Sequence, residues 1–141
     1  MNKNTLLATL FALVFSTTLH AQLPEYATDI SPLLVGENIP DMKLINTDGQ
    51  DVSTLNIFQE NPTVLIFYRG GWCPYCNGHL SEIGQLEDEI IALGYQVVAV
   101  SPDAVAGLEK TGIKNEIKYQ LLSDASGDFT KAVGIAFQAP E

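Results

Sequence analysis

The feature that most constrains the fold is a pair of apolar, β-branched runs separated by one amphipathic stretch. Residues 63–68 and 95–100 show no alternation of polar and apolar side chains, which is typical of strands covered on both faces. Between them, apolar residues recur at steps of three and four from Leu80 to Leu93 and predict a helix that begins at Pro74. This order predicts a parallel βαβ unit with a right-handed crossover.

The remaining segments extend this unit to an α/β domain with helices on the faces of the sheet. The predicted elements are a strand at 42–45, a hairpin turn at 47–50, a helix at 104–110, a strand at 119–122 and a short helix at 129–133. Ser101, Pro102 and Asp103 offer a capped start for the 104–110 helix, and Gly112 is its expected stop.

Length and charge exclude several classes of function. The 141 residues suit one domain, and 7 Lys+Arg against 17 Asp+Glu give a net charge of -10. This acid excess argues against nucleic acid and against an anionic membrane surface as partners. Two cysteines are too few for a disulfide-stapled mini-domain or a self-contained four-ligand zinc site.

Residues 1–21 have the three-part pattern of a signal peptide, with Lys3, an apolar run and a small, polar end at Ala21. The apolar run is about half the ~20 residues that a spanning helix needs, so a signal peptide is favoured over a membrane anchor or a buried helix. The mature chain is therefore expected to be exported, periplasmic or secreted, where disulfides persist. Residues 22–35 are expected to be irregular, and residues 36–141 to form the domain.

Both cysteines lie in Cys73-Pro74-Tyr75-Cys76, directly after the first buried strand and at the start of the long helix. Unpaired N–H groups and the positive end of the helix dipole stabilise a thiolate there and can lower a thiol pKa from about 8.5 to ~3.5–7.5. Cys73 is expected to be the more exposed sulfur and the attacking thiolate. Cys76, one turn further on, is expected to be the resolving thiol, close enough for a Cys73–Cys76 disulfide.

Three other interpretations of the motif are less favoured than thiol–disulfide redox chemistry. A zinc site built on Cys73, Cys76 and His79 would need a fourth ligand from elsewhere. A structural disulfide between neighbouring turns would stabilise little, and a c-type haem needs a histidine where Asn77 stands. No metal or bound cofactor is expected, only an external thiol reductant.

Four neighbouring residues are candidate supporting groups. Arg69 could lower a thiol pKa or hold a substrate oxygen, or simply lie in solvent. Trp72 is expected to cover the sulfur and to form part of a docking surface, with core packing as the alternative. Tyr75 is expected to be exposed and to control access, and His79 to be solvated rather than to relay protons.

The sequence resembles the thioredoxin superfamily and, within it, the peroxiredoxin-like branch of the alkyl hydroperoxide reductase/thiol-specific antioxidant type. The resemblance is carried by residues 36–41, by residues 64–76 with their Cys-Pro-Tyr-Cys motif, and by residues 97–103 with 121–124. It implies a thioredoxin-like fold. The family continues with a cis-proline, two strands and a helix, so the resemblance implies a C-terminally incomplete domain in which the 64–68 strand is an open edge.

The motif departs from the family pattern Pro-x-x-x-Thr/Ser-x-x-Cys. Aligned on Cys76, the hydroxyl position is occupied by Cys73 and the proline position by Arg69, which would make Cys76 the peroxidatic residue. Thioredoxins instead place the nucleophile first, with an acid six residues earlier, where Phe67 stands. The Pro-Tyr pair between the cysteines is the one glutaredoxins use. The attacking sulfur is therefore open.

The preferred function is an exported thiol-dependent peroxide reductase that passes through a sulfenic acid and a Cys73–Cys76 disulfide and is reset by a thioredoxin-like reductant. The alternative is a thiol–disulfide oxidoreductase that acts on exported proteins through a mixed disulfide. A third class is a redox-inert binding module. No nucleic acid and no stable membrane insertion are expected, and a homo-oligomer is left open.

Overall fold

The computed structural model describes residues 22–138, so the predicted signal peptide and the last three residues lie outside the described part. The elements are η1 (Ala27–Asp29), β1 (Lys43–Ile45), β2 (Asp51–Ser53), α2 (Thr54–Glu60), β3 (Thr63–Phe67), α3 (Pro74–Ala92), β4 (Gln96–Ser101), α4 (Val105–Lys114), β5 (Gln120–Ser123) and α5 (Asp128–Ala132). Among residues 22–138, no helix is long and apolar enough to cross a bilayer.

The five strands form one sheet in the order β2-β1-β5-β4-β3. The pairs β3–β4 and β4–β5 are parallel, whereas β1 runs antiparallel to both β2 and β5. The predicted α/β domain with parallel central strands is therefore confirmed. Within the described residues β3 pairs with β4 alone and lies at the edge of the sheet.

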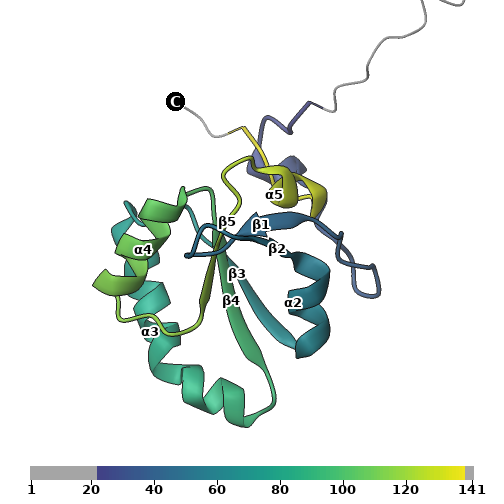
Figure 1. Ribbon diagram of the computed structural model, residues 1–141. Coiled ribbons are helices and arrows are strands. Elements are labelled where there is room, and N and C mark those ends of the chain that lie inside the picture. The colour runs from purple at the N-terminus through teal and green to yellow at the C-terminus, as the bar shows by residue number, and fades with distance from the viewer. Residues whose placement is uncertain (1–21, 139–141) are drawn as a thin grey trace, which may run out of the picture.

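Helices cover both faces of the sheet, with α3 and α4 on one face and α2 and α5 on the other (Figure 1). Alternate residues of β4 supply the two cores: Val98 and Val100 pack with Phe129 of α5, whereas Val97 and Ala99 pack on the opposite face. Leu80 of α3 and Leu108 of α4 complete that second core and are fully buried. Burial on both faces explains why the strand sequence does not alternate.

Two helices differ from the sequence prediction. The sequence analysis missed α2, whose seven residues begin at Ser53, where the side-chain oxygen accepts from the N–H of Asn56. A helix this short offers too few turns for a periodic apolar pattern. The helix predicted for 104–110 runs as α4 to Lys114, through the expected stop at Gly112, and its first turn has no side-chain cap.

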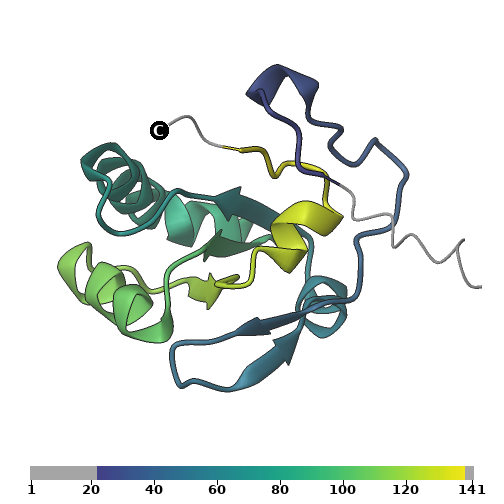
Figure 2. The ribbon, with the colours of Figure 1, turned by 90° about the horizontal axis from the view of Figure 1, so that it is seen from above.

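The chain segments before β1 and after α5 lie side by side (Figures 1 and 2). Backbone bonds tie them together: Ser31 N–H to Gly134 C=O at 3.1 Å, and Gln138 N–H to Pro24 C=O at 2.8 Å. Gly134 has a φ of 76°, and a Cβ there would collide with the Ser31 carbonyl. We call these two joined segments, residues 22–42 and 133–138, the strap, and residues from both segments line the cavity described below.

Candidate active site

The two cysteines occupy the N-terminal turn of α3, as predicted. Cys73 is the N-cap residue, with φ −87° and ψ 112°, and Pro74 is the first helical residue. The N–H of Cys76 is directed at the sulfur of Cys73 across 3.4 Å. The first turn of a helix has N–H groups with no intrahelical partner, and here a sulfur atom accepts from one of them.

The surroundings shift the pKa values of the two thiols in opposite directions. The pKa of Cys73 is lowered, first by a hydrogen bond from the Cys76 side chain, then by the Cys76 N–H, with a smaller effect of the Arg69 guanidinium. The pKa of Cys76 is raised, mainly by burial and next by donating that hydrogen bond. Both thiols are free, and Cys73 is the one of the pair that loses its proton first as the pH rises.

The exposure predicted for the two sulfurs is wrong. Cys73 is only 3% exposed, whereas Cys76 is half-buried. The loop that precedes Cys73 packs closely, since Gly71 lies against Thr111 of α4 and against Asp103 in the loop after β4. The sulfur with the lowered pKa is therefore the less accessible one.

A cavity of about 560 Å³ opens beside Cys76 at the carboxyl ends of β3 and β4. Arg69, Tyr75 and His79 line it together with Cys76, and neither Cys73 nor Trp72 does. Apolar side chains from the segments before β1 and after α5 also line it, among them Leu23 and Ile135. Such a position, at the carboxyl ends of parallel strands, is where ligands bind in α/β folds.

The side chains of Trp72 and Tyr75 lie on the surface beside the thiol pair. Trp72 is 65% exposed and Tyr75 is 90% exposed. Arg69 is also exposed, but its guanidinium carbon lies 4.7 Å from the centre of the Trp72 ring, a cation–π contact that orients the side chain. The predicted exposure of Tyr75 is confirmed. His79 is exposed at the cavity wall, as expected of a solvated histidine.

Sequence reasoning missed two residues that hold the active-site loop. The carboxylate of Asp103 accepts from the N–H of Gly71 at 2.7 Å, and the side-chain amide of Asn77 donates to the Gly71 carbonyl at 2.9 Å. From the sequence, Asp103 was predicted to belong to the capped start of the 104–110 helix. The sequence signal that could have revealed this arrangement is the Gly70-Gly71 pair, because adjacent glycines often mark a close approach of backbone.

A third missed residue is Tyr68, which follows β3 and lines the cavity beside Cys76. Its side chain is 8% exposed, and its hydroxyl has no hydrogen-bond partner among residues 22–138. Burial raises the pKa of this phenol. Its proton therefore stays on the oxygen and is available to a hydrogen-bond acceptor.

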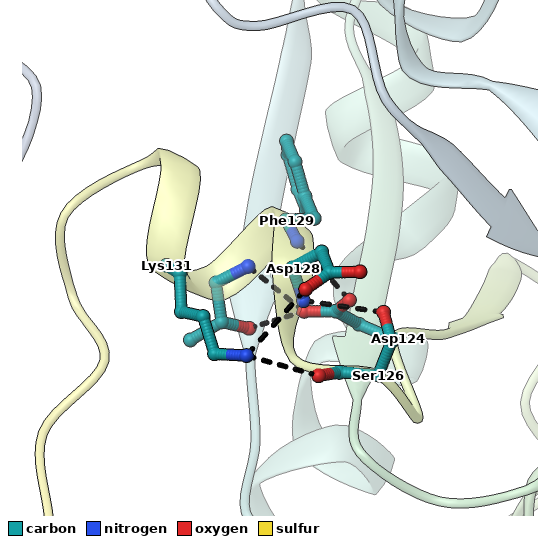
Figure 3. A network of polar contacts seen from close by, with 6 residues as sticks. Asp124, Ser126, Asp128, Phe129 and Lys131 are labelled. Atoms are coloured by element: carbon teal, nitrogen blue, oxygen red, sulfur yellow. Dashed lines mark hydrogen bonds and ion pairs between the residues drawn. The ribbon is translucent and has the colours of Figure 1, made fainter. Parts of the chain in front are cut away.

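Asp124, the residue after β5, lines the cavity and is the centre of a polar network at the start of α5 (Figure 3). This carboxylate is 3% exposed and accepts from the Phe129 N–H at 3.2 Å, the Thr130 N–H at 2.8 Å and the Thr130 hydroxyl at 2.6 Å. Lys131 forms a surface ion pair with Asp128 at 3.4 Å. Asp124 thus fixes α5, from which Thr130 and Lys131 reach the cavity.

The alternative of a metal site finds no support in the arrangement of the side chains. Across residues 22–138, no three His, Cys, Asp or Glu side chains gather closely enough to hold a metal ion. This applies to Cys73, Cys76 and His79, the trio considered from the sequence.

Comparison with known proteins shows which family the chain belongs to. A model of the AhpC/TSA family matches residues 35–140. A putative peroxiredoxin bcp of Haemophilus influenzae is 29% identical over 106 residues, which cover 75% of this chain and 68% of the relative. A thioredoxin-like protein of the same organism is 31% identical over 100 residues, covering 70% of this chain and 57% of that protein.

Solved structures agree with the fold. The crystal structure of peroxidoxin BcpB from Mycobacterium tuberculosis superposes with a TM-score of 0.66 at 26% identity and covers 70% of this chain and 64% of that one. Reduced Prx3 of Vibrio vulnificus, solved in complex with H2O2, gives a TM-score of 0.69 at 24% identity, with 72% and 68% covered. The described chain thus has the thioredoxin-like fold of peroxiredoxins and spans about two thirds of these structures.

Proposed function

Because the chain belongs to the AhpC/TSA family, we propose that it is a thiol-dependent peroxidase that reduces a hydroperoxide with Cys73 and Cys76. The observation that carries the proposal is the placement of the half-buried Cys76 in the cavity wall, next to a buried sulfur whose pKa is lowered. A peroxide is small enough to reach the Cys76 sulfur from this cavity.

The reaction begins with a proton transfer within the pair. The Cys76 thiol donates a hydrogen bond to the Cys73 thiolate, so the proton can pass to Cys73 as Cys76 attacks. A bond forms between the Cys76 sulfur and the terminal peroxide oxygen, the O–O bond breaks, and the leaving alkoxide or hydroxide takes the proton from Cys73. Cys76 is then a sulfenic acid, and Cys73 is again a thiolate.

The second step closes the disulfide. The Cys73 thiolate attacks the sulfenic sulfur of Cys76 and displaces hydroxide, which leaves a Cys73–Cys76 disulfide. An external dithiol must then reduce this bond through a mixed disulfide and become oxidised itself. Trp72 and Tyr75, exposed beside the pair, form the surface that we assign to this thioredoxin-type reductant.

The test combines turnover with trapping of the sulfenic acid. The purified chain, from Gln22 onwards, is expected to consume hydrogen peroxide and cumene hydroperoxide with dithiothreitol or with thioredoxin and its reductase. In the Cys73→Ser variant a sulfenic acid should be trapped by dimedone on Cys76, and the Cys76→Ser variant should form little adduct. The reverse pattern would make Cys73 the attacking residue, and no peroxide consumption by the unaltered chain would overturn the peroxidase.

Thiol–disulfide exchange is the second candidate, and one observation favours it. The lowered pKa belongs to Cys73, the first cysteine, which is the order expected for a thioredoxin-type nucleophile. The 3% exposure of Cys73 disfavours attack on a protein disulfide. Faster reduction of insulin than of peroxide, measured with the same reductant, would favour this candidate over the peroxidase.

We also propose that the protein is exported, on the pattern of residues 1–21 alone. Expression of the full chain in a Gram-negative host, followed by fractionation, is expected to place it outside the cytoplasm with an N-terminus at Gln22. An intact N-terminus in the cytoplasmic fraction would contradict export.

A further inference from the structure

The N–H and the carbonyl of Gly71 are each held by a side chain, one from the loop after β4 and one from α3. The Gly71 N–H donates to Asp103 at 2.7 Å, and the Gly71 carbonyl accepts from Asn77 at 2.9 Å. Asp103 follows β4, whereas Asn77 lies in α3 directly after Cys76. Gly71 therefore connects the loop that ends at Cys73 to two other elements.

The two side chains that hold Gly71 are themselves fixed. The Asn115 amide donates to the Asn77 side-chain oxygen at 3.0 Å, which sets the orientation of the Asn77 amide. The Asp103 N–H donates to the Ser101 hydroxyl at 3.2 Å, and the Asp103 carbonyl accepts from the Ser123 hydroxyl at 2.6 Å. These contacts anchor the loop to β4, β5 and α4.

Steric contacts leave the loop little room to move. A Cβ on Gly70 would lie 2.8 Å from the Asp103 carboxylate, and Gly70 has a φ of 138°, where side chains are strained. A Cβ on Gly71 would collide with the Thr111 hydroxyl. Close packing and hydrogen bonding thus hold the same two residues.

We propose that Asp103 and Asn77 are positioning residues that hold Gly71 and thereby keep the Cys73 sulfur on the N–H of Cys76. Gly71 is two residues before Cys73, and the Cys73 N–H donates to the Gly70 carbonyl at 3.1 Å, so a shift of this loop moves the sulfur. The Cys76 N–H and the Cys73 sulfur are 3.4 Å apart, an ordinary distance for a hydrogen bond to sulfur. A displacement weakens this hydrogen bond and destabilises the thiolate.

The inference rests on the proposed function of the cysteine pair, but its test does not need peroxide turnover. The pKa of Cys73 is measured by alkylation of the reduced protein at graded pH, with every variant made in a Cys76→Ser background so that one thiol is followed. If the peroxidase proposal fails, this pKa remains measurable. Thermal unfolding of each variant is recorded beside it.

Two substitutions at Asp103 separate the hydrogen bond from the charge. Asp103→Ala removes the acceptor and is expected to raise the Cys73 pKa by about half a unit, which slows alkylation roughly threefold below the pKa. Asp103→Asn keeps an acceptor oxygen and is expected to shift the pKa by less than about 0.2 units. Asp48→Ala, at an exposed carboxylate in the turn between β1 and β2, is the control and should leave the pKa of Cys73 unchanged.

Three outcomes overturn the proposal. Equal lowering of the pKa in both Asp103 variants would show that only the carboxylate charge matters. A lower melting temperature with an unchanged pKa would show a purely structural role. If Asp103→Ala does not fold, Asn77→Ala removes the other contact to Gly71. An unchanged pKa in a folded Asn77→Ala protein would equally reject the positioning role, and a rise of similar size would support it.

Discussion

The sulfur of Cys73 caps the helix that carries Cys76, at 3.4 Å from the Cys76 N–H. The capping position usually holds an oxygen of Ser, Thr, Asp or Asn, so the reactive group here also serves as part of the helix terminus. A substitution at either cysteine is therefore expected to change the ionisation of the other.

Replacement of Cys76 tests this coupling directly. The side chain of Cys76 is the largest cause of the lowered Cys73 pKa, so Cys76→Ala should raise that pKa. In Cys76→Ser the hydroxyl can still donate to the thiolate, so the Cys73 pKa should stay closer to its value in the unaltered protein. The measurement is iodoacetamide alkylation of Cys73 against pH, and equal pKa values in the two variants would contradict the assignment.

The lowered pKa of Cys73 also makes stability depend on pH. Because the folded-state pKa lies below the unfolded value of about 8.5, ionisation favours the folded state. That contribution is fully present above the unfolded pKa and is lost as the pH falls through the folded pKa. Urea unfolding of reduced Cys76→Ser should therefore gain stability with rising pH over this window, relative to the Cys73→Ser/Cys76→Ser double variant. A constant difference between pH 5.5 and about 9 would contradict a lowered pKa.

Local sequence patterns were sufficient to predict the parallel βαβ unit and the positions of the two cysteines at the start of α3. Residues 97–100 are apolar on both faces because β4 lies between β3 and β5 with helices on both sides. Pro74 lacks an N–H and fits only the first helical positions, so it fixes Cys73 as the cap and Cys76 within the first turn. Both features can be read from residues that are close together in the sequence.

The exposure of Cys73 and the partners of Asp103 depend on contacts between distant segments. Asp103 is separated from Gly71 by 32 residues, and a local pattern cannot distinguish a carboxylate that caps its own helix from one that reaches another loop. The strap is also beyond local patterns, because the N–H of Ser31 donates to the carbonyl of Gly134, far along the chain. Such contacts follow from the packed sheet rather than from periodicity.

Arg69 is expected to stabilise the thiolate through its charge. Its guanidinium lowers the pKa of Cys73 and lowers that of Cys76, although other causes raise the latter overall. Arg69→Gln should therefore raise the Cys73 pKa by a few tenths of a unit, a small shift because Arg69 is exposed and screened by salt. Arg69→Lys keeps the charge and is the matched control. An effect that persists unchanged in 1 M salt would argue for a structural role instead.

Asp124 and Asp128 allow the contributions of a buried and an exposed carboxylate to the free energy of unfolding to be compared. Asp124 is 3% exposed and accepts three hydrogen bonds, so Asp124→Ala should lower the free energy of unfolding by roughly 1–3 kcal/mol per group left unpaired (Figure 3). Asp128 forms one exposed ion pair with Lys131, so Asp128→Ala should cost less than about 1 kcal/mol. Chemical denaturation measures both, and equal losses would contradict the network.

The contact between Gly71 and α4 predicts a rescue by a second substitution. A methyl group on Gly71 would meet the Thr111 hydroxyl, so Gly71→Ala should destabilise the protein by about 1–3 kcal/mol through overpacking. Thr111→Ala removes that hydroxyl and its hydrogen bond to the Gly107 carbonyl, at a cost of about 1 kcal/mol. In the double variant the two losses should not add, because the methyl group occupies the space that the hydroxyl vacates. A double-mutant cycle in urea measures this coupling. Strict additivity would show that the loss in Gly71→Ala does not come from contact with Thr111, in which case the close packing of Gly71 against α4 does not hold the active-site turn.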